Sequence, residues 1–152
     1  MSMDTDLIRI PKRKESLNLN TGVFCKSVHF LDTELGKCVI VGIFKNRGDS
    51  LGVLFKGRKG SVFWSHDCFN QLLAHFNDVT LALEGKSNFF VRLDTGEDIK
   101  VNNVFGKQYV YVYDGLHTLS MNRSEWGQFI ENLPLIYIKV RELFACEDLI
   151  KT

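Results

Sequence analysis

The chain has 152 residues, of which 45% are hydrophobic and 24% are charged, and its formal net charge is +1. This composition is typical of one folded globular domain, and it excludes a largely disordered chain and a polybasic nucleic-acid-binding protein. A polyanion ligand would therefore need positive charge gathered on one face. The four cysteines form no CxxC pair, and the sequence contains neither a secretion signal nor an apolar run of about 18 residues. These features predict an intracellular, reduced protein with no membrane partner.

The first 24 residues are polar and aperiodic, which predicts a flexible N-terminal arm. Its basic cluster, Pro11-Lys12-Arg13-Lys14, is compatible with three roles: a nuclear-import signal, a phosphate-contacting tail or an ordinary solvated terminus. Residues 25–152 are expected to form one compact body.

From Ser27 onwards, apolar and polar residues alternate in short segments, which predicts β-strands at 27–30, 38–44, 51–55 and 61–64. A helix follows, and Ser65 is suited to cap its start. One face of this helix is formed by apolar residues at i, i+3, i+4 and i+7, namely Phe69, Leu72, Leu73 and Phe76. The segment 79–83 alternates again and predicts a further strand.

The same order returns 57 residues later. Strands are predicted at 89–93, 98–104, 108–113 and 118–121. A helix begins near Arg123, where Asn122 and Glu125 form a capping-box pattern. Its apolar face repeats the first one, with Trp126, Phe129, Ile130 and Leu133. An alternating run at 136–140 follows and is again predicted to be a strand.

The sequence therefore predicts an α+β fold of two ββββα repeats, at about 25–85 and 88–152. Each repeat of roughly 60 residues buries too little surface to be comfortably stable alone. The polar turn at 84–88 is too short to separate independent domains. We expect the two repeats to share one core, with approximate internal two-fold symmetry.

The sequence contains no motif for catalysis or metal binding. Gly85-Lys86-Ser87 is similar to the end of a phosphate-binding loop, but the earlier glycine of such a loop falls at Thr80, inside a predicted strand. The four histidines lack the spacing of metal ligands, and no GxSxG segment occurs. We predict no catalytic residue, no metal and no cofactor, and hence a protein that is not an enzyme. A catalytic group assembled from distant residues is the alternative that one sequence leaves open.

Aromatic and basic residues are interleaved along the predicted strands. Tyr109, Tyr111 and Tyr113 share one face by the two-residue period, while Val104, Val110 and Val112 are expected to face the core. Bases of a single strand stack on rings at roughly 1 to 3 kcal/mol each, and lysines and arginines contact the phosphates. The alternative is that the tyrosines only pack against another layer. The candidate nucleic-acid-binding residues are Phe44, Lys45, Arg47, Lys56, Arg58, Lys59, Lys100, Asn102, Phe105, Lys107, Tyr109, Tyr111 and Tyr113.

Short segments of the second repeat occur in a characteristic order, at 99–107, 109–114, 119–122 and 125–128. The first repeat supplies counterparts in Gly57-Arg58-Lys59-Gly60, Val62, Trp64 and Phe69. Together these segments resemble the single-stranded-DNA-binding domain of the transcriptional coactivator family called positive cofactor four. The resemblance covers nearly the whole chain after residue 26, taken as two copies.

The resemblance implies a curved four-stranded antiparallel sheet and a helix in each repeat, with the repeats joined through their helices as an intramolecular pseudo-dimer. It also implies that single-stranded DNA runs along basic and aromatic ridges of the sheets. The chain departs from the family at Asn102 and Tyr113, where the family has arginines, and at Val104, where it has phenylalanine. The two missing arginines remove charge, so we expect the second repeat to bind more weakly or to depend on stacking.

Our leading prediction is a sequence-tolerant protein that binds single-stranded DNA in transcription, replication or repair, with RNA as an alternative ligand. Transcription or replication proteins are its expected partners, and its location is nuclear if the source is a eukaryote or a virus of one. The alternative is a protein-interaction adaptor or transcription cofactor with the same fold and weak or no nucleic-acid binding. We expect a monomeric pseudo-dimer or a homodimer.

Overall fold

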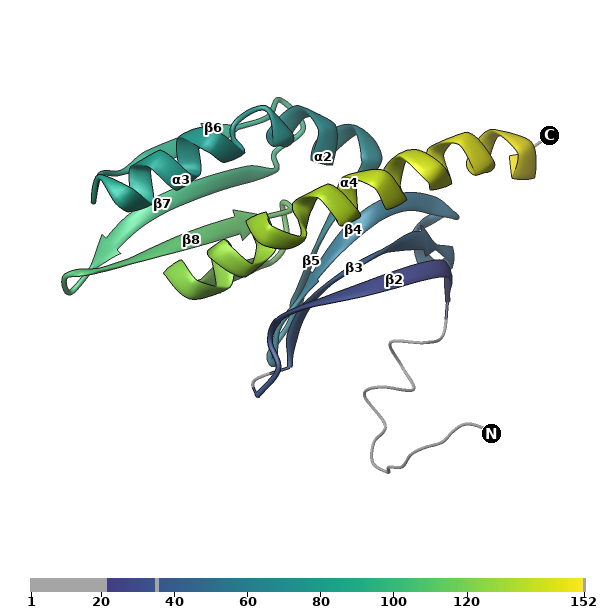
Figure 1. Ribbon diagram of the computed structural model, residues 1–152. Coiled ribbons are helices and arrows are strands. Elements are labelled where there is room, and N and C mark those ends of the chain that lie inside the picture. Colours follow the sequence, from purple (N-terminus) through teal and green to yellow (C-terminus); the bar gives the residue numbers. More distant parts are fainter. Residues whose placement is uncertain (1–21, 35, 152) are drawn as a thin grey trace.

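The computed structural model describes residues 22–34 and 36–151 of the chain, with side chains as far as Cys146 (Figure 1). Two four-stranded antiparallel sheets form, and consecutive strands are neighbours in each. Sheet one contains β2 (Val23–Asp32), β3 (Lys37–Phe44), β4 (Ser50–Lys56) and β5 (Ser61–Ser65). Sheet two contains β6 (Phe89–Arg92), β7 (Asp98–Val104), β8 (Lys107–Tyr113) and β9 (Thr118–Met121). The predicted α+β fold of two four-stranded repeats is confirmed.

Most of the predicted N-terminal arm, including Pro11-Lys12-Arg13-Lys14, lies outside the described residues. Strand β2 already begins at Val23, so the last two residues assigned to the arm belong to sheet one. A β-bulge interrupts the pairing of β2 with β3 between Phe24 and Ser27, where Cys25 adopts a positive φ of 55°. Bulges of this kind twist an edge strand and discourage pairing with another chain.

In the described residues, α-helices follow each set of four strands, and one short 3-10 turn, η1 (Lys45–Arg47), lies between β3 and β4. The first repeat ends in α2 (His66–Leu73) and α3 (Phe76–Glu84), and the second repeat ends in α4 (Arg123–Lys151). The apolar residues predicted to form one helical face in the first repeat are therefore divided, because α2 ends at Leu73 and Phe76 begins the next helix.

The strands predicted at 79–83 and 136–140 are wrong, since both segments are helical. In α3, Val79 and Leu83 are buried while Leu81 is 55% exposed, whereas strand alternation would bury all three together. In α4, Ile136 and Val140 are buried at the helical spacing while Ile138 is 54% exposed. A window of five residues is too short to distinguish a period of two from a period of 3.6.

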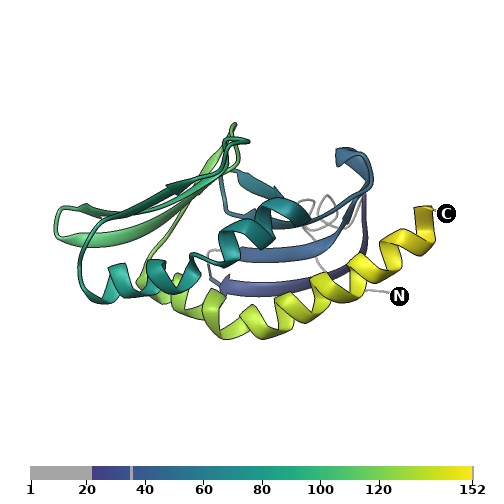
Figure 2. The ribbon, with the colours of Figure 1, turned by 90° about the horizontal axis from the view of Figure 1, so that it is seen from above.

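The helices are exchanged between the repeats. Helix α3 of the first repeat contacts β6, β7 and β8 of sheet two, and α4 of the second repeat packs mainly across β2, β3 and β4 of sheet one. Figure 2 shows α4 extending from the second sheet along the strands of the first. Each repeat thus supplies a helix that covers the sheet of the other. This exchange explains how two small repeats obtain one core.

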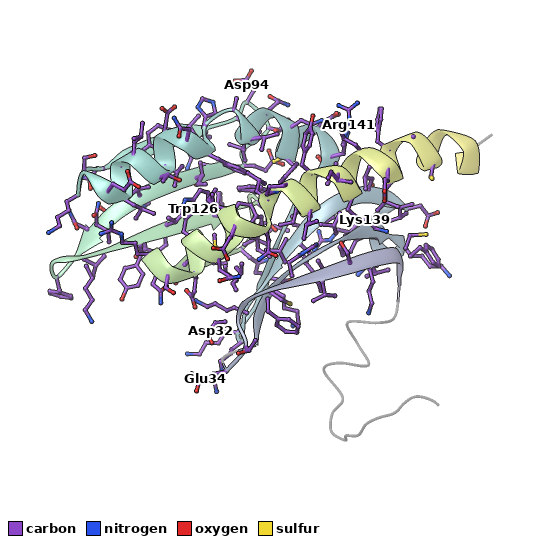
Figure 3. The ribbon with its side chains drawn as sticks, viewed as in Figure 1. Asp32, Glu34, Asp94, Trp126, Lys139 and Arg141 are labelled. Carbon is purple, nitrogen blue, oxygen red and sulfur yellow. The ribbon has the colours of Figure 1, made fainter. Side chains whose placement is uncertain are left out.

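One hydrophobic cluster contains buried residues from both repeats. Its centre is aromatic: the ring centroid of Phe76 lies 5.5 Å from Trp126 and 5.4 Å from Phe129, and that of Phe55 lies 5.4 Å from Phe129. Trp126 projects from α4 between the helices and the sheets (Figure 3). A smaller cluster of Cys38, Ile40 and Phe44 lies on the opposite face of sheet one.

The predicted capping residues act as expected. The Ser65 hydroxyl accepts a hydrogen bond from the Cys68 backbone N–H at 3.3 Å at the start of α2. At the start of α4, the Asn122 side chain accepts from the Glu125 N–H and the Glu125 carboxylate accepts from the Asn122 N–H, both at 2.8 Å. The Glu125 carboxylate also accepts from Lys37 Nζ at 3.0 Å, which ties α4 to the beginning of β3.

Replacing Asn122 by alanine removes the side-chain half of this capping box. We expect the free energy of unfolding to fall by about 1 kcal/mol, because the Glu125 N–H loses its acceptor. Urea denaturation followed by circular dichroism measures the change. Asn88→Ala, an exposed position in the turn between the repeats, is the matched control and should leave stability nearly unchanged. Equal losses in the two variants would contradict the capping role.

Candidate nucleic-acid interface

The two faces of sheet two differ in chemistry. Ile99, Val101, Val110 and Val112 point toward the helices and are fully or almost fully buried. Because side chains alternate along a strand, their neighbours lie on the other face. The open face, as we call it below, carries Phe90, Arg92, Asp98, Lys100, Asn102, Val104, Tyr109, Tyr111 and Tyr113. The prediction that Val104 faces the core is wrong, because it stands opposite Lys107 on this side of the sheet.

Aromatic rings and a lysine stand beside one another on the open face. Phe90, Lys100 and Tyr111 occupy directly opposed positions on β6, β7 and β8, so they lie in one row across the sheet. The Nζ atom of Lys100 is 5.5 Å from the centroid of the Tyr111 ring. The rings of Tyr109 and Tyr111 have centroids 6.4 Å apart and are tilted by 54°. The Phe90 side chain is 54% exposed, so this row offers ring surface and positive charge together.

The open face contains a second cation, but its charge is neutralised. Arg92 donates from Nε and Nη2 to Oδ2 of the nearly buried Asp98, at 3.1 and 2.9 Å. Its guanidinium also lies 5.3 Å from the centroid of the Phe90 ring. Arg92 therefore positions Phe90, whereas Lys100 forms no ion pair with any described residue.

The β7–β8 hairpin presents an exposed ring at its tip. Phe105 and Gly106 form the turn with φ angles of 50° and 79°, the left-handed values that a two-residue hairpin turn of this type requires. The Phe105 side chain is fully exposed, and the exposed Lys107 follows it. A phenylalanine in this backbone region is rare, and such strained residues are concentrated at functional sites.

A cleft of about 700 Å³ continues the open face toward the first repeat. On one side it is lined by Arg58 and Lys59 of the β4–β5 hairpin, and on the other by Leu116 and His117 of the β8–β9 loop. Thr118 and Ser120, also part of the lining, stand opposite Tyr113 and Tyr111 on β8. The predicted residues Arg58 and Lys59 therefore face β9 across this cleft, and β9 lies between them and the tyrosines of β8.

Other predicted site residues are not brought to this surface. Phe44 is 3% exposed and packs edge-to-face against Phe63 with centroids 5.1 Å apart, so the prediction that it offers a ring for stacking is wrong. Lys45 and Arg47 lie in η1, before β4, whereas Arg58 follows that strand. Because β4 spans roughly 20 Å, Lys45 and Arg47 lie at the end of the strand away from Arg58 and its cleft.

The outer face of sheet one, where Lys56 stands opposite Cys38, is apolar. Arg47 lies 4.6 Å from the centroid of the Phe63 ring at the edge of this face.

Burial raises the pKa of the Cys38 thiol, and nearby Lys56 and Lys26 offset only part of that effect. Burial likewise raises the pKa of the Cys68 thiol in the core. Both thiols are therefore protonated near neutral pH and poorly nucleophilic.

Sequence reasoning missed several residues of this surface. Phe90 and Arg92 could have been found, because the predicted strand at 89–93 fixes their side by the same two-residue period that placed the tyrosines. Leu116 and His117 reach the surface only because two loops distant in sequence meet, and the sequence carries no signal for that meeting.

Within residues 22–34 and 36–151, no group of three or more histidine, cysteine or acidic side chains is arranged to hold a metal ion. None of the helices in this part of the chain combines the length and the apolar character needed to cross a bilayer. Comparison with known protein families, with curated proteins and with solved structures finds no match to the chain.

Proposed function

We propose that this protein binds single-stranded nucleic acid, in the first place DNA, without sequence preference and without catalysis. The observation that carries the proposal is the open face of sheet two, where exposed Phe90 and half-buried Tyr109 and Tyr111 flank Lys100. Rings of this kind stack on any base, which gives affinity without sequence readout. The bases must be unpaired, because duplex bases are already stacked on one another.

The positions of three basic side chains suggest how a nucleic-acid strand crosses the open face. Lys107 lies at one end of β8, and Arg58 and Lys59 line the cleft beyond β9 at the other end of the aromatic surface. A strand laid between them crosses Tyr109, Tyr111 and Tyr113 while its phosphates face lysine and arginine side chains. The near-neutral net charge of the chain is compatible with this path, because the positive charge is local.

A role in transcription, replication or repair follows from this ligand. The resemblance of short sequence segments to the positive cofactor four family favours transcription, and replication and repair expose the same single strands. Transcription or replication proteins are then the expected partners, and the nucleus is the expected location in a eukaryotic cell. RNA remains a second ligand, since an aromatic sheet face stacks bases of both kinds.

Binding should depend strongly on salt. If about six phosphates are neutralised, affinity for a single-stranded oligonucleotide falls by roughly 10² to 10³ between 50 and 200 mM salt, from a slope near −0.7 per contact. Fluorescence anisotropy with a labelled oligothymidine measures this slope. A duplex of equal length should bind more weakly, and an RNA of equal length tests the choice of sugar. Salt-independent binding, or a preference for duplex, contradicts the proposal.

A specific observation favours the second candidate function, a protein-interaction adaptor. Phe24, Val28 and Phe30 of the edge strand β2 are 49%, 39% and 51% exposed, which is unusual for three large apolar side chains of one strand. If the protein binds no oligonucleotide at low salt, the adaptor role is favoured. Replacement of Arg58, Lys59 and Lys107 by alanine separates the two candidates, because it weakens oligonucleotide binding only if the path described above is used. The mass in solution distinguishes a monomeric pseudo-dimer from a homodimer.

A further inference from the structure

Three cations from separate segments lie close together beside Tyr109, near the start of β8. Lys86 comes from the turn between the repeats, Lys107 follows the β7–β8 hairpin turn, and Arg123 is the first residue of α4. They line one open depression of about 280 Å³, whose remaining lining residues are Gly106, Gln108, Tyr109 and Asn122. No acidic side chain is among these residues.

No acidic side chain lines the depression beside the three cations, whereas two other cations of the fold are paired with carboxylates. Lys37 is paired with Glu125, and Arg92 is paired with Asp98. In the part of the chain that the structure describes, Lys86, Lys107 and Arg123 form no ion pair. Like charges that share one depression repel each other, so this arrangement lowers the stability of the free protein.

The backbone that carries each cation is held in place by hydrogen bonds or by a tight turn. The Gln108 side chain donates to the carbonyl oxygens of Ala82 and Ser87, at 3.2 and 3.0 Å, and so holds the turn that carries Lys86 against β8. Lys86 itself has a left-handed φ of 53°. The hairpin turn fixes Lys107, and the reciprocal Asn122–Glu125 bonds fix the helix start at Arg123. Repelling charges on rigid supports form a site prepared for an anion.

We propose that this depression binds a phosphate group of the nucleic-acid strand and anchors the strand at this end of the open face. The inference rests on the proposed function. Tyr109 lines the depression, and its ring is the neighbour of the Tyr111 ring on the open face. A nucleotide whose phosphate is held in the depression therefore has its base next to the Tyr109 ring. The fully exposed Phe105 flanks the same hairpin and offers a second surface for that base. The phosphate belongs either to an internal phosphodiester or to a phosphorylated strand end.

The test uses the full chain with Lys86→Asn and Arg123→Gln combined. Asparagine accepts the left-handed backbone of position 86, and glutamine keeps most of the length of Arg123. We expect oligothymidine binding at 0.1 M salt to weaken by about fivefold for one lost phosphate contact, and the salt slope to decrease in magnitude by about 0.7. The matched control is Lys139→Gln with Arg141→Gln, which removes the same charge from α4 (Figure 3). Equal weakening in both double variants overturns the site, because net charge alone then accounts for the loss.

Two further measurements identify the phosphate and keep the outcomes separate. Oligonucleotides with a 5′-hydroxyl, a 5′-phosphate or a 3′-phosphate are compared: equal weakening for all three indicates an internal phosphodiester, and weakening confined to one phosphorylated end indicates that end. Inorganic phosphate, compared with chloride at equal ionic strength, should raise the melting temperature of the wild type and not of the Lys86→Asn, Arg123→Gln variant. If the wild type binds no oligonucleotide, the proposed function fails, while this phosphate-specific shift still establishes the anion site. If the variant binds every oligonucleotide as the wild type does and phosphate causes no specific shift, the site is overturned and the proposed function stands.

Discussion

Replacing Tyr109 and Tyr111 together by alanine is expected to weaken the binding of a single-stranded oligonucleotide by about 2 to 6 kcal/mol, or roughly 30-fold to 10⁴-fold. The two rings are neighbours on the open face, with centroids 6.4 Å apart, and each can stack one base. Lys100 remains in place in this variant, so the attraction of the phosphates persists and the loss reports the stacking. Fluorescence anisotropy at fixed salt measures the affinity, and the salt slope should be nearly unchanged because no phosphate contact is removed.

Two other variants serve as controls for this prediction. Replacement of both tyrosines by phenylalanine keeps the rings and should leave affinity within about threefold, since stacking does not require the hydroxyl. Tyr137→Ala removes a comparable ring from α4, where the Arg141 guanidinium lies 5.7 Å from its centroid, as Lys100 lies beside Tyr111. This variant should bind like the wild type. If Tyr137→Ala weakens binding as much as the sheet variant, or if the sheet variant binds normally, the open face is not the interface.

The strands could be predicted from the sequence because most of them are buried on one face only. In β8, Val110 and Val112 enter the core while Tyr109 and Tyr111 do not, and this difference is visible as alternation. The two helices were placed less well, because the segment around Leu81 alternates over five residues and only the longer helical spacing shows its true period. The exchange of α3 and α4 between the sheets could not be predicted, since it depends on which apolar surfaces meet in three dimensions.

The side of the sheet on which some candidate residues lie could be predicted for the same reason. Tyr111 and Lys100 share the open face, as their positions on predicted strands required. The assignment of Phe44 fails because it treats 38–44 as an alternating strand with one exposed side, whereas β3 is buried on both faces and its residues form a continuous apolar run. Lys86 and Arg123 are 37 positions apart in sequence and meet only because the inter-repeat turn and the start of α4 both pack at one end of β8.

A single aspartate links the β8–β9 loop to the first repeat. Asp114 Oδ1 accepts hydrogen bonds from the backbone N–H groups of Leu116 and His117, at 2.9 and 2.8 Å, and thereby closes its own loop. Its Oδ2 accepts from the Phe63 N–H on the free edge of β5, at 3.1 Å. Next to this bond, the Trp64 indole donates to the Tyr113 carbonyl oxygen at 3.0 Å. Asp114 therefore holds the loop that lines one side of the cleft. It also accepts a hydrogen bond from a backbone N–H group on the edge of β5, which could otherwise pair with another chain.

Replacing Asp114 by alanine is expected to lower the free energy of unfolding by about 3 to 5 kcal/mol, because three backbone donors lose an ionised acceptor at a partly buried site. Asp114→Asn separates the two functions of the side chain. Its amide oxygen still closes the loop, but its amide nitrogen cannot accept from the Phe63 N–H, so we expect a loss of about 2 kcal/mol. Urea denaturation at pH 7 measures both values. A loss of less than about 0.5 kcal/mol for the asparagine variant contradicts a stabilising bond between the repeats.

The same contacts set the pH dependence of this effect. Burial alone would raise the pKa of Asp114, but the backbone hydrogen bonds from His117, Phe63 and Leu116, together with the nearby His117 charge, outweigh it and lower the pKa below its ordinary value of 3.8. A carboxyl group with a lowered pKa in the folded state stabilises the fold above its unfolded pKa, and this contribution is lost as the pH falls through the folded pKa. The stability difference between the wild type and Asp114→Asn should thus be constant from about pH 5 to 8 and shrink below about pH 4. Urea denaturation at intervals across this range measures the difference, and a gap that grows on acidification contradicts the assigned role of the Asp114 carboxylate.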